Sequence, residues 1–326
     1  MKQFLSAILN SGTPKQRKQK TFAVTAIAIT AALIVIALVT LCALAIADAV
    51  TAPAPAPEGE GSGNTGVARD LVTTTFDEGQ LYKGNLIVTN DTYVMQDTPT
   101  LELLNDKRPR NEAGSPLYTI LGWTTLSVTP DTSEAFHKMY NDFHTENATA
   151  AENLIVAVAA TESAPELYKN GQTLSLEYYI SYTSSTEYEK ASIANADAYA
   201  WIRNNAYKYG FLLATKPTAT ADNTVAPYVL RYVGLEHAAL AEDVDCETLE
   251  DYLTYLRDNT SPAKTKSISV SVTGADGKTS KVSYKIFYQA HADGATYYTA
   301  DPSKYTATVS GDNMSGYIVS YCAISK

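Results

Sequence analysis

A long apolar run near the N-terminus is the strongest hydrophobic signal in the chain. Residues 22–47 are 26 consecutive positions without a charged side chain. As a helix, such a run extends roughly 39 Å and can cross a hydrocarbon core of about 30 Å. Its upstream flank carries five basic residues and no acidic one. The positive-inside rule therefore predicts a cytoplasmic tail at 1–21, one transmembrane helix at 22–47 and an extracellular remainder.

A cleaved signal peptide is the main alternative for the same run. Ala45, Ile46 and Ala47 fit a small-residue cleavage site. The apolar region of a signal peptide is usually about 7–15 residues long, however, so the length favours a retained anchor. Lipid attachment at Cys42 is disfavoured because Leu41 stands where a small residue is expected. Both the anchor and the signal peptide would export the folded part of the chain.

Patterns of folded structure begin only after a linker at residues 48–72, which starts rich in Pro, Ala, Gly and Glu. This composition buries little and predicts an extended spacer. Apolar residues at helical spacing predict helices at 132–148, 194–211 and 248–256. We expect the first of these to begin at a Thr132 or Ser133 cap, the second at an Asn195 or Asp197 cap and to end at Gly210. A turn at Lys83 and Gly84 is followed by a predicted short strand at 85–90, and a run of β-branched and small apolar residues predicts a buried strand at 153–161.

The C-terminal part, residues 259–326, has a different pattern. Strand-like runs at 267–272, 281–290, 305–310 and 316–324 are separated by Gly- and Asp-containing turns. These runs predict a small β unit, either a satellite domain or strands added to the main body. Together with the helices upstream, the pattern favours an α+β fold.

Charge and cysteine content narrow the classes of partner and site. The net charge is −10, and all 35 acidic residues follow position 47, whereas five of the 25 basic residues precede it. An acidic ectodomain disfavours nucleic acid as a partner. Cys246 and Cys322 could pair outside the cell or remain two separate thiols, and spacing alone leaves this open.

Residues alone reveal no assembled catalytic centre. The chain has four histidines, and His137 and His144 would lie two helical turns apart, too far to share one ion. HExxH, GxSxG and glycine-rich phosphate motifs are absent from the sequence.

One segment, WIRNNAYKYGF followed by APYVLRYVG, resembles the VanY-type D-alanyl-D-alanine carboxypeptidases. That family has NA-x-x-YGF followed by E-P-W-H-x-R-Y-V-G, and residues 205–211, Pro227 and 231–234 match in register. LEDYLTYL at 249–256, GNLIVTND at 84–91 and the β-rich tail resemble further parts of the family. The resemblance implies a LAS/VanY-like fold over 73–258, with a central antiparallel sheet flanked by helices. It also implies a zinc peptidase that trims peptidoglycan peptides.

The departures from the family pattern fall on its chemical groups. In EPWH the Glu is the general base and the His is a zinc ligand, but Ala226 and Val229 stand there. The stretch LEYYISYTSS corresponds to the second zinc motif, SxHxxGxxxD, and has Tyr178 at its His and Ser185 at its Asp. A one-residue shift would instead use Glu177 and Ser184.

A further departure concerns the arginine that grips the substrate carboxylate in the family's SGYRS segment. Glu162 occupies this position and reverses its charge. Aliphatic and hydroxyl groups cannot hold zinc, and no carboxylate remains to activate water. We therefore predict no cofactor, with the family's zinc lost and no catalytic residue kept.

Three hypotheses follow from this pattern. The first is an inactive, membrane-anchored wall-facing protein that binds peptidoglycan stem peptides or a cell-wall protein partner. Its candidate cleft is lined by Glu162, Tyr178, Tyr179, Tyr182, Tyr228 and Arg231. The alternative is an active carboxypeptidase with a rebuilt site that uses Glu177, Glu187 or His237. A weaker third hypothesis is an adhesin-like surface protein, suggested by the 23 tyrosines and the β-rich tail.

Overall fold

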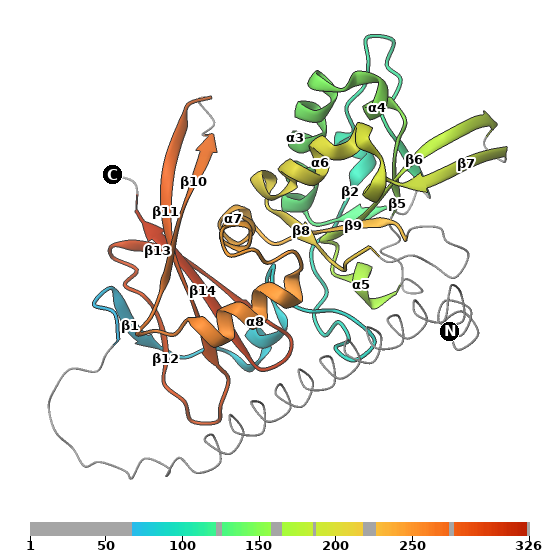
Figure 1. Cartoon of the computed structure of the whole chain (residues 1–326). Helices are drawn as coiled ribbons and strands as arrows, with labels where there is room; N and C mark the ends of the chain where they lie inside the picture. Colours follow the sequence, from blue (N-terminus) through green and yellow to red (C-terminus); the bar gives the residue numbers. More distant parts are fainter. Residues whose placement is uncertain are drawn as a thin grey trace, which may run out of the picture. The chain divides into compact units, whose positions relative to one another are not determined.

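A mixed β-sheet carries the segments that resemble the carboxypeptidase motifs. The computed structural model describes residues 67–121, 126–157, 165–184, 187–217, 226–273 and 277–324. In spatial order the described strands of this sheet are β3 (Thr119–Leu121), β5 (Leu154–Ala157), β6 (Thr173–Ser184), β9 (Tyr228–Tyr232) and β8 (Phe211–Leu213), with β7 (Glu187–Ser192) paired to β6 (Figure 1). The predicted α+β class is confirmed, but the sheet is not purely antiparallel. Strands β3 and β5 run parallel because a helical crossover connects them.

Helices cover one face of this sheet. Helix α3 (Pro130–Glu146) is followed by the short helix α4 (Ala148–Glu152), and α6 (Ala200–Asn205) packs beside α3. Helix α3 begins earlier than predicted, because the Thr129 hydroxyl accepts the Thr132 amide and Pro130 fits the first turn. The core beneath includes Phe136, Tyr140 and Phe143 from α3 and Leu174 and Leu176 from β6.

The second predicted helix ends at Gly210, directly before the chain enters strand β8 of the sheet. Helix α6 is continued by a 3₁₀ turn (Ala206–Tyr209) that stops at Gly210, where φ is +88°. A Cβ at this position would lie 2.8 Å from the Tyr232 ring, so both the backbone angle and the space favour glycine. The predicted stop at Gly210 is confirmed. The described helix α5 (Glu166–Lys169) and the pair β2 (Glu102–Leu103) and β4 (Ser127–Val128) complete this part.

The C-terminal strands form a second sheet. Its order is β10 (Lys266–Thr273), β11 (Thr279–Ala290), β14 (Gly316–Ala323) and β13 (Tyr305–Gly311), and all its pairs are antiparallel. Strand β12 (Tyr297–Ala300) pairs instead with β1 (Leu71–Thr74). Helices α7 (Leu235–Asp243) and α8 (Leu249–Asn259) share a buried cluster with residues of β11 and β14. The predicted strands of the tail are thus confirmed, as is the third helix, which Thr248 caps.

The segment around Leu86 corrects one prediction. Residues 84–91 do not form a strand, although Leu86 and Val88 are buried. Their backbone groups bond to loop atoms instead: the Val88 amide donates to the Asp312 carbonyl, and Asn313 donates to the Val88 carbonyl. An apolar run followed by a turn cannot reveal this, because the partners lie more than 200 residues away in the sequence.

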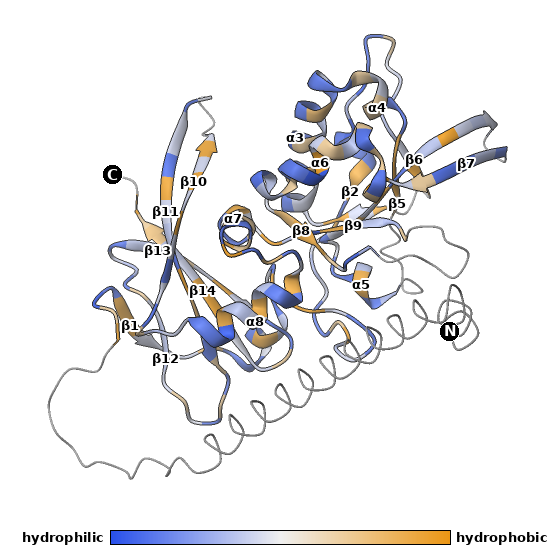
Figure 2. Ribbon diagram, in the orientation of Figure 1, coloured by the Kyte–Doolittle hydropathy of each residue, from blue (hydrophilic) through white to orange (hydrophobic). Residues whose placement is uncertain are grey.

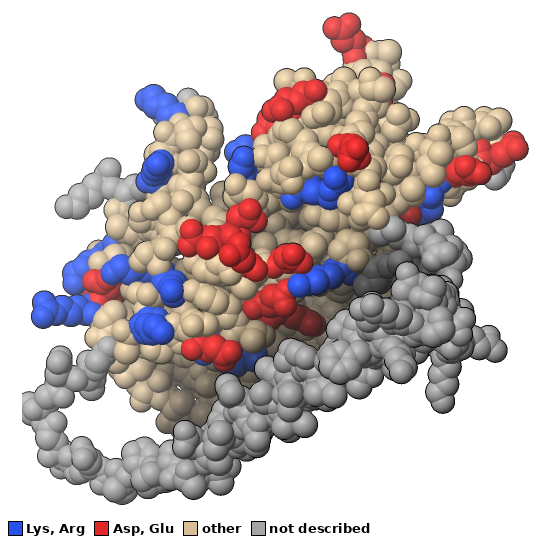
Figure 3. Space-filling model, viewed as in Figure 1, with Lys and Arg blue, Asp and Glu red and all other residues tan. Residues whose placement is uncertain are grey.

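Hydropathy and charge follow the elements. Strands β5 and β8 are largely hydrophobic, whereas β7 is largely hydrophilic (Figure 2). In the view of Figure 3, acidic side chains gather over α7 and α8, with basic ones over the second sheet. The predicted cytoplasmic tail, the membrane helix and most of the linker lie outside the described residues. Within the described ranges, no helix is long and apolar enough to span a bilayer. The domain boundaries at 72/73 and 258/259 stay predictions.

Candidate functional site

Strand β9 carries the segment that resembles E-P-W-H-x-R-Y-V-G, and its alternation divides these residues between two faces. Tyr228 and Leu230 are buried in the core beneath the helices. Because side chains alternate along a strand, Val229 and Arg231 face the opposite side of the sheet. Both are buried, with exposed fractions of 6% and 1%. The predicted zinc-ligand position, Val229, and the predicted cleft residue Arg231 therefore lie on the face of the sheet away from α3 and α6.

The neighbouring strand β6 presents Ser175 and Glu177 on that same face. Leu174 and Leu176 point into the helix-covered core, so the odd-numbered residues point the other way. Ser175 lies directly opposite Val229 in the β6–β9 register. Glu177 follows two residues later, where β6 stops pairing with β9 and begins pairing with β7.

The Glu177 carboxylate is paired within the protein. Its side chain is only 10% exposed, and the Lys190 ammonium from β7 lies 2.5 Å from its Oε2 atom. Lys190 is 36% exposed, so one end of the pair is open to water. A buried carboxylate without a partner would be strongly unfavourable, and Lys190 removes that penalty.

Comparisons with known proteins agree with this arrangement of motifs. A D-alanyl-D-alanine carboxypeptidase of Enterococcus faecium is 26% identical over 268 residues, which cover 78% of this chain and 81% of that protein. Over most of its length the chain is therefore similar to a D-alanyl-D-alanine carboxypeptidase, in line with the resemblance carried by its motifs. Among solved structures, the vancomycin-resistance D,D-dipeptidase VanXYg, in complex with a D-Ala-D-Ala phosphinate analogue, shares the fold. It matches 77% of this chain and 99% of that chain with a TM-score of 0.50 and 14% identity. No family model matches the sequence.

Tyr178, the residue predicted at the histidine of the SxHxxGxxxD motif, does not share a face of the sheet with Val229. Ligands of one ion must converge, but Tyr178 packs into the helix-covered core with its ring centroid 5.0 Å from that of Tyr199. Tyr178 therefore faces away from Val229 and cannot stand for a zinc ligand. Ser185 lies outside the described residues, and Ser184 is the last residue of β6.

Glu177 is the acidic residue of β6 that shares a face with Val229, which makes it the candidate for the aspartate position of the motif. Counting back seven residues places Asn170 at the histidine position and Thr173 at the glycine. Asn170 is 1% exposed, and its amide donates to Thr89 and accepts from Gln172 and Thr173. In that register, an asparagine that links a loop to the start of β6 would stand at the family's histidine position.

These residues do not fit the family's zinc. Val229 has no atom that can coordinate a metal. The Asn170 side chain already hydrogen-bonds to neighbouring residues, and the Glu177 carboxylate already forms an ion pair with Lys190. Ala226 supplies no carboxylate to activate water. Within the described residues, no cluster of three His, Cys, Asp or Glu side chains could hold a metal ion.

The cleft predicted from the sequence is not assembled by its candidate residues. Tyr178 and Tyr228 belong to the helix-covered core, and burial raises the pKa of Tyr228 to about 12. Tyr179 and Tyr182 lie on the β6–β7 hairpin, where Tyr182 is 59% exposed. Arg231 is buried beneath the 84–91 segment. Glu162 lies outside the described residues.

The three residues of the rebuilt-site hypothesis also lie apart. Glu187 is exposed at the start of β7, whereas His237 is buried in α7. The His237 Nδ1 atom shares a hydrogen bond with the Tyr252 hydroxyl at 3.0 Å, and burial lowers the pKa of His237. His237 is therefore held neutral inside the protein, away from the Glu177–Lys190 pair.

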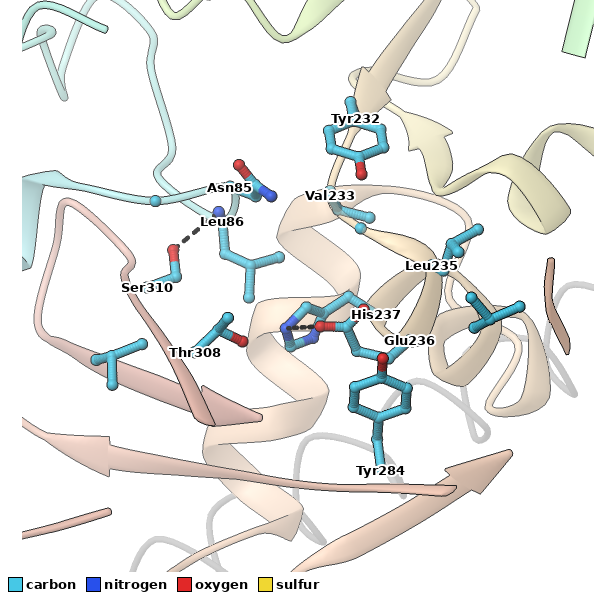
Figure 4. Close-up of a pocket in the computed structure, with 14 residues that line it drawn as sticks. Asn85, Leu86, Tyr232, Val233, Leu235, Glu236, His237, Tyr284, Thr308 and Ser310 are labelled. Atoms are coloured by element: carbon cyan, nitrogen blue, oxygen red, sulfur yellow. Dashed lines mark hydrogen bonds and ion pairs between the residues drawn. The ribbon is translucent and has the colours of Figure 1, made fainter. Parts of the chain in front are cut away.

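A pocket lies beside His237. It has a volume of about 370 Å³ and is lined by residues of the 84–86, 232–237 and 308–310 segments together with Val272 and Tyr284. The Glu236 carboxylate accepts a 3.0 Å hydrogen bond from Ser320 and lies 3.8 Å from the His237 Nε2 atom (Figure 4). The sequence offered no signal for this pocket beyond the position of His237 just after the RYVG motif.

Cys246 and Cys322 are free thiols in the structure. They lie in different surroundings, Cys246 beside the core shared by α7 and α8, and Cys322 on β14 opposite Tyr284. The alternative of two separate thiols is the one observed.

Proposed function

We propose that this protein is a non-catalytic VanY-type family member that binds peptidoglycan stem peptides at the bacterial cell surface. A cell-wall protein partner is the other ligand that the sequence analysis left open. The fold and the family relationship support a role at the wall, and the altered residues of the site support the absence of hydrolysis.

The Glu177–Lys190 pair carries the proposal. In a metallopeptidase this carboxylate position serves the metal, whereas here a side-chain cation 2.5 Å away neutralises it. Val229 lies diagonally across from Glu177 on the same face and offers only methyl groups there. Removal of the donors and addition of an internal cation together favour an arrangement that is stable without metal.

Metal content and peptidase activity of the purified full-length chain test the loss of catalysis. We expect less than one tenth of an equivalent of zinc by mass spectrometry after incubation with the metal and gel filtration. We also expect no release of D-alanine from a pentapeptide ending in D-Ala-D-Ala. Stoichiometric zinc accompanied by D-alanine release would instead establish an active carboxypeptidase with a rebuilt site.

Sedimentation with purified insoluble peptidoglycan tests the wall-binding part. We expect the chain to be retained more than an unrelated acidic protein of similar size, and soluble stem peptide to release it. Equal retention of the two proteins would exclude wall binding. Retention that survives competition by stem peptide would assign the interaction to another wall component.

The proposed location is the bacterial cell membrane, with residues 22–47 as a single-pass anchor and the folded part outside. Protease treatment of intact protoplasts should remove a C-terminal epitope and spare an N-terminal one. Finding the C-terminal epitope protected would contradict this topology. Absence of the N-terminal epitope from the membrane fraction would indicate cleavage as a signal peptide.

A further inference from the structure

The pocket beside His237 contains a single charged side chain among the described residues that line it, and that side chain is Glu236. The Glu236 side chain is 16% exposed, so a molecule in the pocket can reach it. In the described part of the chain, no Lys or Arg nitrogen lies within 4 Å of the Glu236 carboxylate. The pocket therefore contains a negative charge that no basic side chain balances.

The neighbouring histidine does not supply the missing positive charge. The His237 Nε2 atom lies 3.8 Å from the Glu236 Oε1 atom, but burial lowers the pKa of His237, so its imidazole is neutral at physiological pH. Glu236 also lies in the first turn of α7, where the helix dipole favours a carboxylate. A helix end supplies only roughly half a unit of positive charge, so part of the Glu236 charge remains for a ligand.

Two hydroxyl groups of the second sheet hold one oxygen of this carboxylate and leave the other free. The Ser320 hydroxyl on β14 donates to the Glu236 Oε1 atom at 3.0 Å. The Thr308 hydroxyl on β13 lies 2.6 Å from the Ser320 Oγ atom and can donate to it in turn. No hydrogen bond from the described residues reaches the Glu236 Oε2 atom. The packing of α7 on the sheet thus orients Oε2 as an acceptor without a partner.

The rest of the pocket combines apolar walls with tyrosine hydroxyl groups. The hydroxyl groups of Tyr232 and Tyr284 point into the space from opposite sides (Figure 4). Burial and the nearby Glu236 charge raise the pKa of Tyr284 to about 12, so its hydroxyl stays protonated. Aliphatic surface comes from Leu86, Val233, Leu235, Val272 and Val309. Such a lining suits a ligand with an apolar stem and a cationic end.

We infer that this pocket binds a primary ammonium group at the end of an unbranched alkyl chain, as in a lysine side chain. An ammonium group has three N–H donors and can bond to the Glu236 Oε2 atom and to tyrosine hydroxyl groups together. The alkyl chain would cover the aliphatic walls. The volume of about 370 Å³ is within the range of pockets for small organic ligands and far larger than a bare metal ion needs. This inference goes beyond the proposed function and does not depend on wall binding.

Calorimetric titration of the full-length chain at physiological salt tests the inference. The probes are Nα-acetyl-lysine N-methylamide and the corresponding norleucine compound, which lacks the ammonium group. We expect the lysine probe to bind at least about fivefold more tightly, because only its ammonium group can pair with Glu236. Equal binding of the two probes, or binding of neither, would overturn the inference. Pentylamine separates the two sources of such a group: binding weaker than that of the lysine probe assigns the pocket to peptides, and binding as tight or tighter assigns it to free amines.

Two substitutions of matched charge on α7 locate the site. Glu236→Gln removes the charge but keeps the shape of the side chain, and should reduce binding of the lysine probe to the level of the norleucine probe. Glu242→Gln removes the same charge about 9 Å further along the helix, where Glu242 is exposed and lines a different cavity. This distance exceeds the screening length at physiological salt, so binding should not change. Equal effects of the two substitutions would show that the ammonium group binds elsewhere.

Tyr284→Phe keeps the aromatic ring but removes one hydroxyl acceptor from the pocket. It should weaken binding of the lysine probe about threefold and leave binding of the norleucine probe unchanged. Equal weakening of both probes would contradict a contact between the ammonium group and this hydroxyl. If Glu236→Gln does not fold, Tyr284→Phe and the comparison of the two probes on the wild type still decide the outcome.

Discussion

The ion pair between Glu177 and Lys190 leads to an asymmetric prediction for stability. Replacing Lys190 with Met leaves a carboxylate of 10% exposure without its partner, whereas replacing Glu177 with Gln leaves a lysine that is already 36% exposed. The lysine can turn toward water, but the carboxylate cannot. We therefore expect Lys190→Met to cost about 2–4 kcal/mol and Glu177→Gln about 1 kcal/mol.

The size of the pairwise coupling follows from the geometry. Two unit charges about 4 Å apart attract by roughly 4 kcal/mol at an effective dielectric constant near 20. Desolvation of the carboxylate and exposure of the lysine offset much of this attraction. A coupling of about 1–2 kcal/mol remains. The double variant should consequently be more stable than Lys190→Met alone, because it no longer contains an unpaired buried charge.

Urea denaturation of the wild type, both single variants and the double variant gives this coupling from a double-mutant cycle. The pair between Glu102 and Lys107 serves as a matched control, since its side chains are 26% and 52% exposed. That control cycle should give at most about 0.5–1 kcal/mol. Additivity within about 0.5 kcal/mol at Glu177 and Lys190, or a larger cost for Glu177→Gln than for Lys190→Met, would refute the reasoning.

Three further changes have defined outcomes. The triple variant Asn170→His, Val229→His and Lys190→Met should bind zinc near stoichiometry by calorimetry, because it restores two imidazoles beside a free carboxylate; a folded triple variant without zinc would refute the register. His137 has its pKa lowered by burial to about 4, so its neutral form stabilises the fold fully above pH 6.5. About 3 kcal/mol should be lost between pH 6.5 and 4, and His137→Gln should flatten this part of the unfolding profile. Gly311→Ala would place a Cβ 1.9 Å from a backbone carbonyl and should lower the unfolding free energy by about 2 kcal/mol or more, measured by urea denaturation.

The spacing of apolar residues along the sequence predicted those helices and strands that bury one continuous side of the element. Helices α3 and α8 and the tail strands are of this kind, because their core contacts recur at the spacing of the element itself. The α+β class followed from the same patterns. The pairing of β1 with β12 could not be foreseen, since it joins residues more than 200 positions apart through a four-residue strand.

There is a physical reason why the sequence alone could not show which residues align with the degenerate zinc motif. With its histidine, glycine and aspartate replaced, the motif offered no invariant residue to align it, and the choice of LEYYISYTSS as the corresponding stretch placed it at Tyr178 and Ser185. Only the alternation of β6 against β9 shows that Glu177, rather than Tyr178, shares a face with Val229.

The departures at this site are physically coupled. Loss of the histidine positions alone would leave Glu177 as an isolated buried negative charge, which is the costliest arrangement. The lysine that neutralises it comes from β7, whose pairing with β6 begins at Glu177 itself. A valine at 229 is compatible with this pair because an apolar side chain needs no hydrogen-bond or ionic partner when it is buried. The site is therefore an ion pair beside an apolar surface, in which the Glu177 charge has a partner. A metal site that had only lost its histidines would instead contain an unpaired buried charge.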